Sequence, residues 1–205
     1  MGTSVDWDKV LSTAGIGIQA VDVGCSGGMP YRWEYLGSAL RYLGIDPLER
    51  EITKLQERAR KGQEYISCFV QSPGGTGSTD QRCSEYFQRT SAAVQINSGF
   101  DVIKENFNSG QEVVFSNRHL TVSEILENST IGSIDLLKID IDGDDFPCYR
   151  AFTQHARAQS LLMLDIESQF HGDDGADGNT FVNISTLARS KNLDLFSLDA
   201  YRYSR

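Results

Sequence analysis

Hydrophobic and polar positions follow two patterns that alternate along the chain. Short runs of consecutive apolar residues are typical of strands buried on both faces, and apolar residues recurring every three or four positions are typical of amphipathic helices. The strand-like runs cover residues 17–23, 43–47, 64–70, 133–141, 160–167 and 193–201. The helix-like segments cover residues 32–43, 48–62, 119–128, 144–158 and 180–192. This alternation predicts an α/β fold, with a doubly wound, mostly parallel sheet and helices on both faces.

Local sequence signals support several of these boundaries. Gly62 is expected to end the helix that begins at residue 48, and Pro147 is tolerated in the first turn of the helix over 144–158. Thr121 or Ser123 is expected to cap the helix over 119–128. These signals agree with the periodicity.

Composition favours one domain over residues 1–205. The chain has 205 residues, of which 40% are hydrophobic, enough for a substantial core, and it shows no internal repeat and no interdomain linker. Residues 71–118 begin with a stretch rich in Gly, Ser and Thr and then lose periodicity, so we expect a loop or insertion there. The chain ends directly after its last predicted strand, so either the sheet ends there or the chain is part of a longer protein.

Charge and hydropathy exclude several function classes. A net charge of −9 argues against binding to nucleic acid, because such proteins present basic stripes. No apolar run approaches the ~18 residues that a membrane helix needs, and the N-terminus lacks the order of a signal peptide, so we expect a cytoplasmic protein. The four cysteines show no C-x-x-C spacing and are expected to be free thiols. Nothing in the sequence indicates the oligomeric state.

A glycine-rich loop follows the first predicted strand. Residues 24–28 read "GCSGG", and ligands of open α/β sheets bind at this carboxyl edge. Asp46 ends the next strand and could accept the hydroxyls of a ribose, which indicates an adenosine-containing cofactor; the alternative is a tight turn beside a surface acid. The spacing differs from G-x-G-x-x-G, which disfavours a nicotinamide oxidoreductase. Asp22 suits a ligand that carries a sulfonium and an ammonium group.

Acidic residues also end two later strands. Asp140 and Asp142 follow the run over 133–141 and are expected to share a face, as a general base or as oxygen ligands of Mg²⁺. Alternatively, Asp140 orders the loop backbone without transferring a proton. Glu167 and His171 follow the next strand, and His171 is either a general base or simply solvated. Lys138 lies within a buried strand, so we expect it to pair with a neighbouring acid.

Several motifs resemble a known family. "VDVGCSGG" followed by "GIDP" resembles the first two motifs of class I S-adenosylmethionine-dependent methyltransferases. "TVSEIL" and "SIDLLKIDIDGDDFPCYRAF", followed by "LLMLDIE", resemble the FkbM-type methyltransferases, so that the resemblance covers residues 18–70 and 119–205. It implies a Rossmann-like class I methyltransferase fold. Such folds usually close with an antiparallel last strand, and we expect this chain to end before one. The family usually has Glu where Asp142 stands.

The resemblance implies S-adenosyl-L-methionine as cofactor and methylation of a hydroxyl on a saccharide or other small molecule. A divalent metal is not expected. The alternatives are a non-catalytic cofactor-binding module of a larger protein and, less favoured, an NAD-dependent oxidoreductase. The residues assigned to the cofactor are Asp22, Gly24, Cys25, Ser26, Gly28, Asp46, Pro47, Phe69 and Val70, and the catalytic candidates are Asp140, Asp142, Glu167 and His171.

Overall fold

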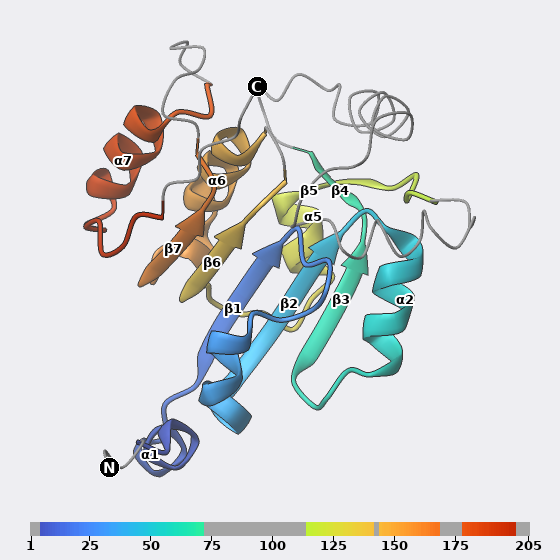
Figure 1. Ribbon diagram of the computed structural model, residues 1–205, viewed down its shortest axis with the longest axis vertical. Helices are drawn as coiled ribbons and strands as arrows, with labels where there is room; N and C mark the ends of the chain where they lie inside the picture. The colour runs from blue at the N-terminus through green and yellow to red at the C-terminus, as the bar shows by residue number, and fades with distance from the viewer. Residues whose placement is uncertain (1–4, 72–113, 142–143, 169–177, 200–205) are drawn as a thin grey trace.

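The computed structural model describes residues 5–71, 114–141, 144–168 and 178–199. Five strands form one parallel sheet in the order β3-β2-β1-β6-β7 (Figure 1). The sheet order reverses at β1, so the doubly wound parallel α/β prediction is confirmed. The strands are β1 (Ile18–Val23), β2 (Leu40–Asp46), β3 (Gln63–Ser67), β6 (Leu136–Ile139) and β7 (Met163–Ile166).

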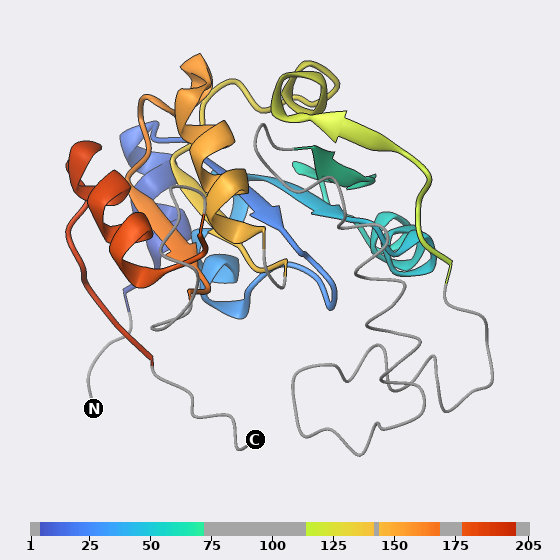
Figure 2. The ribbon, with the colours of Figure 1, turned by 90° about the horizontal axis from the view of Figure 1, so that it is seen from above.

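Helices cover both faces of this sheet. One face packs against α5 (Val122–Glu127), α6 (Asp145–Gln154) and α7 (Phe181–Ser190). The other packs against the 3₁₀ segment η1 (Tyr31–Ala39) and α2 (Glu49–Glu57). Figure 2 shows α5 and α6 on one side of β1 and β6, with η1 on the other. None of the described helices is long and apolar enough to cross a membrane.

The residues of each strand divide between two cores because neighbouring side chains point to opposite faces. Val21 and Val23 of β1 belong to the core under α5 and α6, and Ala20 belongs to the core under η1. The pattern places Asp22 on the same face as Ala20, toward η1. The strand register therefore decides which polar residues reach the η1 face.

The predicted helix over 32–43 is only partly correct. Gly37 adopts φ 53° and ψ −128°, which no helix accommodates, so the segment is a broken 3₁₀ helix. Residues 40–43 belong to β2 instead, where Tyr42 and Leu43 are fully buried. The apolar positions that suggested one helix therefore belong to a short helical segment and to the start of a buried strand.

The predicted strand over 64–70 is two strands in different sheets. Cys68 separates β3 from β4 (Phe69–Gln71), which pairs in parallel with β5 (His119–Thr121) in a small second sheet. The chain changes partner because the Phe69 amide donates to the Arg118 carbonyl at 2.8 Å. Ser116 lies just beyond the end of β2, because its amide donates to the Pro47 carbonyl.

Several predicted helix ends need correction. The second predicted helix is α2, which ends at Glu57 rather than at Gly62, where φ is +90° in the turn before β3. The helix predicted over 144–158 ends at Gln154 and is followed by the 3₁₀ turn η2 (Ala156–Ala158). Thr121, one of the two predicted caps, does begin α5, through a reciprocal capping box with Glu124.

Two further elements differ from the prediction. Residues 193–199 form no strand, and Leu195, Phe196 and Leu198 are exposed, so that part of the last predicted strand is wrong. A helix that we did not predict, α1 (Trp7–Ala14), begins at the Asp6 cap and ends at Gly15, which is left-handed at φ 66°. Asp6 and Gly15 are residue types typical of the start and the end of a helix, so the sequence does contain signals for α1.

Candidate functional site

Polar residues gather at the carboxyl end of the sheet, on the face toward η1. The register places Asp22 of β1 beside Lys138 of β6, and Lys138 beside Asp165 of β7. Asp140 and Glu167 lie two residues beyond Lys138 and Asp165, directly after the ends of β6 and β7. The strand-end carboxylates of the sequence prediction therefore lie along one edge of the sheet.

Asp22 is the buried centre of this group. Its side chain is 1% exposed and accepts hydrogen bonds from the Tyr42 hydroxyl at 2.8 Å and the Lys138 ammonium at 3.0 Å. Burial raises the pKa of the Asp22 carboxyl, and the Lys138 ammonium opposes that rise. Burial alone would lower the pKa of Lys138, but the carboxylates of Asp22 and Asp140 raise it, so the amine stays charged. The prediction that Lys138 pairs with an acid is confirmed.

Asp140 is the most accessible described carboxylate in contact with this group. Its side chain is 53% exposed, and its Oδ2 lies 3.6 Å from Lys138 Nζ. Glu167 is also exposed, and its backbone amide donates to the Ile139 carbonyl at the end of β6. The structure thus brings Asp140 and Glu167 to neighbouring strand ends, where both are open to solvent. Asp142 and His171 lie outside the described residues.

The glycine loop leaves the carboxyl end of β1. Gly24, Gly27 and Gly28 all have positive φ, and a Cβ added to Gly24 would lie 1.9 Å from the Asp140 carbonyl oxygen. A Cβ added to Gly27 would meet nothing within 4 Å. The loop is therefore tightly packed on β6 at its start and open at Gly27. Cys25 points inward and is buried, and burial raises the pKa of its thiol.

Asp46 is buried beneath this loop at the end of β2. One carboxylate oxygen accepts from the Ser26 amide at 3.1 Å and the Ser26 hydroxyl at 2.8 Å, and the other accepts from the Leu48 amide at 2.9 Å. Asp46 is only 5% exposed, and this burial raises the pKa of its carboxyl. Asp46 and Ser26, both assigned to the cofactor, are thus joined directly.

The remaining cofactor assignments lie beside the small sheet. The Pro47 carbonyl accepts from the Ser116 amide at 2.7 Å. Phe69 is buried with its ring stacked on His119 at 5.1 Å between centroids, and Val70 packs against the core under α5 and α6. The structure does not bring Phe69 or Val70 into contact with the glycine loop through any described interaction.

Four contributors to this edge were not predicted. The Tyr42 hydroxyl of β2 donates to the Asp22 carboxylate, and Arg32 of η1 forms an ion pair with Asp165. Asp145, buried in the first turn of α6, accepts from the Ile141 amide at 3.0 Å and the Asn179 side-chain amide at 3.0 Å. Asp145 thereby joins the segment after β6 to the segment before α7. The acidic run "DGDD" was its only sequence signal.

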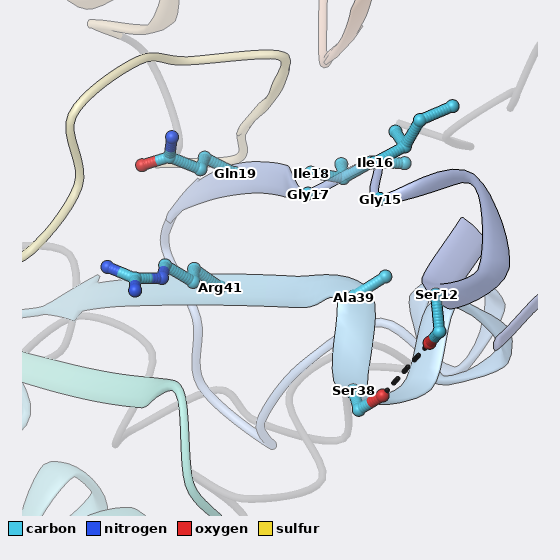
Figure 3. A pocket seen from close by; sticks show the side chains of 9 residues that line it. All are labelled: Ser12, Gly15, Ile16, Gly17, Ile18, Gln19, Ser38, Ala39 and Arg41. Atoms are coloured by element: carbon cyan, nitrogen blue, oxygen red, sulfur yellow. Dashed lines mark hydrogen bonds between the residues drawn. The ribbon is translucent and has the colours of Figure 1, made fainter.

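A separate open cavity lies at the opposite edge of the sheet. It has a volume of about 300 Å³ and lies at the amino ends of β1 and β2, where Ser12 and Ser38 are hydrogen-bonded and Arg41 extends along β2 (Figure 3). The glycine loop lies at the other end of β1, after Val23. Within the described ranges, no three His, Cys, Asp or Glu side chains are grouped so as to hold a metal ion.

Comparison with known proteins agrees with this geometry. The methyltransferase FkbM domain model matches residues 28–185 of the 205. No curated protein and no solved structure matches the chain. The five-stranded parallel sheet with helices on both faces has the architecture of a class I methyltransferase. By its fold and by this match over most of its length, the chain belongs to the FkbM methyltransferase family.

Proposed function

We propose that the protein transfers a methyl group from S-adenosyl-L-methionine to a hydroxyl oxygen of a saccharide or another small molecule. The observation that carries the proposal is the buried carboxylate of Asp46 at the end of β2, joined to a glycine loop at the end of the adjacent β1. This juxtaposition lies at the point where the sheet order reverses, the usual ligand position in open α/β sheets. It occurs in a chain of a methyltransferase family.

The residues present fit an adenosine cofactor with a positive charge. The backbone at Gly27 borders open space, and Asp46 presents carboxylate oxygens at the adjacent strand end for ribose hydroxyls. Asp22, Asp140 and Lys138 together carry a formal charge of −1, which favours a cationic ligand. The donors that Ser26 directs at Asp46 would be exchanged, in part, for those of the ribose.

Asp140 is our candidate general base. When bound, the cofactor supplies a methyl group on a sulfonium, whose carbon–sulfur electron pair returns to sulfur as the acceptor oxygen forms its new bond. The acceptor hydroxyl must lose its proton, and Asp140 is exposed at the strand end where it could receive it. Glu167 on the neighbouring strand end is the second described candidate, and Asp142 and His171 stay predictions.

Calorimetric titration with S-adenosylhomocysteine, with NAD as the control ligand, tests the cofactor. We expect binding of the first and not of the second. Asp46→Asn should weaken that binding at least about tenfold because it replaces one carboxylate oxygen by a donor. Asp194→Asn, a matched change at an exposed residue, should not alter it. Binding of NAD alone would favour an oxidoreductase, and binding of neither ligand would contradict the proposal.

Methyl transfer from labelled S-adenosylmethionine to a panel of mono- and oligosaccharides and small alcohols tests the reaction. Asp140→Asn should retain affinity for S-adenosylhomocysteine and lose turnover. Equal turnover in this variant would remove Asp140 from the candidates. A wild-type protein that binds the cofactor and methylates no hydroxyl in the panel would favour the non-catalytic alternative.

A further inference from the structure

Lys138 occupies a central position at the proposed cofactor edge. It projects from β6, the strand beside β1, and its side chain is only 18% exposed. The ammonium reaches three oxygen atoms: Asp22 Oδ1 at 3.0 Å, the Gly24 carbonyl at 3.2 Å and Asp140 Oδ2 at 3.6 Å. A single cation therefore connects the end of β1, the start of the glycine loop and the candidate base.

These contacts constrain the loop from one side. The Gly24 amide donates to the Ile45 carbonyl of β2 at 2.8 Å, while the Gly24 carbonyl accepts from Lys138. The first residue of the loop is thus held between β2 and β6. Asp140 is held on its backbone as well, because its amide donates to the Val23 carbonyl at 2.9 Å. Lys138 adds an ion pair to the Asp140 carboxylate.

Lys138 also supplies the one positive charge in the group that it forms with Asp22 and Asp140. Two carboxylates, Asp22 and Asp140, lie within 3.6 Å of its ammonium, so that the three groups sum to −1. Arg32 of η1 pairs with Asp165 instead. Loss of the Lys138 charge would therefore leave two carboxylates with no cationic partner that the structure shows for them.

We propose that Lys138 is a positioning residue that orients Asp140 and the Gly24 carbonyl and sets how strongly the site prefers a cationic sulfonium ligand over its neutral thioether product. The inference rests on the proposed function, because it presumes that S-adenosylmethionine binds at this edge. S-adenosylmethionine and S-adenosylhomocysteine differ in formal charge at sulfur. The ratio of their dissociation constants therefore reports the electrostatics of the site, largely free of packing effects that both ligands share.

The test compares Lys138→Met with wild type by calorimetry for both ligands. Removal of the ammonium should favour the sulfonium ligand, so the dissociation constant of the thioether divided by that of the sulfonium should rise about tenfold. Lys138→Arg keeps the charge and should leave the ratio within about twofold of wild type. Lys54→Met removes another partly buried lysine, which pairs with Glu51 on α2, and it should not move the ratio.

A compensating variant keeps the test sound if Lys138→Met folds poorly. Asp22→Asn combined with Lys138→Met restores the formal charge of −1, so the ratio should return to that of wild type. The inference is overturned if Lys138→Met changes both affinities by the same factor, or if the double variant keeps the ratio of the single one. Failure of the wild type to bind either ligand would instead refute the proposed function itself.

Discussion

Two buried tyrosines allow the energetic role of the site to be measured against an internal control. Tyr42 and Tyr149 are both 0% exposed. The Tyr42 hydroxyl donates to Asp22 at 2.8 Å, whereas the Tyr149 hydroxyl has no hydrogen-bond partner within the part of the chain that the structure describes. Burial, together with the nearby Asp22 carboxylate, raises the pKa of Tyr42 far above its usual value, so its phenol remains a donor.

Replacement of each tyrosine by Phe removes the same atom from the same kind of environment. A hydrogen bond to a charged group contributes about 1.5–3 kcal/mol, so Tyr42→Phe should lower the free energy of unfolding by that amount. Tyr149→Phe removes a buried hydroxyl without a described partner, so it should leave the free energy of unfolding unchanged or raise it by up to about 1 kcal/mol. The two variants should therefore differ by at least about 1.5 kcal/mol.

Urea unfolding followed by circular dichroism measures both variants under identical conditions. The changes in volume are the same, so packing terms largely cancel and the difference reports the hydrogen bond to Asp22. Equal free energies of unfolding for the two variants would show that the Tyr42–Asp22 bond does not stabilise the site. A larger loss in Tyr149→Phe would show that its hydroxyl is satisfied in solution.

Three more predictions concern the same architecture. Gly24→Ala should cost more than about 3 kcal/mol, because it combines positive φ with a Cβ 1.9 Å from the Asp140 carbonyl oxygen, while Gly27→Ala should cost about 1–2 kcal/mol from its φ alone. Urea unfolding of the two variants measures this, and similar losses would contradict the packing argument. Thr121→Ala should cost about 1 kcal/mol by loss of the α5 capping box, and an unchanged unfolding midpoint would contradict that role. Burial raises the pKa of Asp46 above 3.8, so the native protein holds this proton to higher pH than the unfolded chain does. The stability of wild type relative to Asp46→Asn should therefore fall as pH rises from about 4 through the native pKa, and a difference that is flat or rises over this range in urea titrations would refute it.

The sequence predicted the sheet better than the segments beside it. Strands buried on both faces appear as continuous apolar runs, so most of the parallel sheet could be located without its neighbours. The segment over 32–43 was misassigned because its apolar spacing suits a helix, whereas Gly37 breaks that helix and Tyr42 is buried in a strand. Residues 193–199 have the composition of a strand, but pairing depends on a partner strand that composition does not specify.

The site was predictable to the extent that parallel strands end at one edge. That rule alone placed Asp22, Asp46 and Asp140 near one another. The pairing of Lys138 with Asp22 depends on the register between β1 and β6, strands separated by more than a hundred residues. The contact of Tyr42 with Asp22 depends likewise on the geometry of β1 and β2, so it could not be read from the order of residues.

The bare backbone of the loop "GCSGG" has two different physical causes. At Gly24 a side chain is excluded by the protein itself, since any Cβ would clash with the Asp140 carbonyl oxygen. At Gly27 no protein atom lies within 4 Å of a Cβ, so only the positive φ disfavours a side chain there. Neither glycine therefore requires a closely approaching ligand to explain it. The open space at Gly27 is nevertheless where a ligand has room. A cofactor would therefore enter at that opening, beside the buried carboxylate of Asp46, while Gly24 joins the loop to the end of β6, where Asp140 lies.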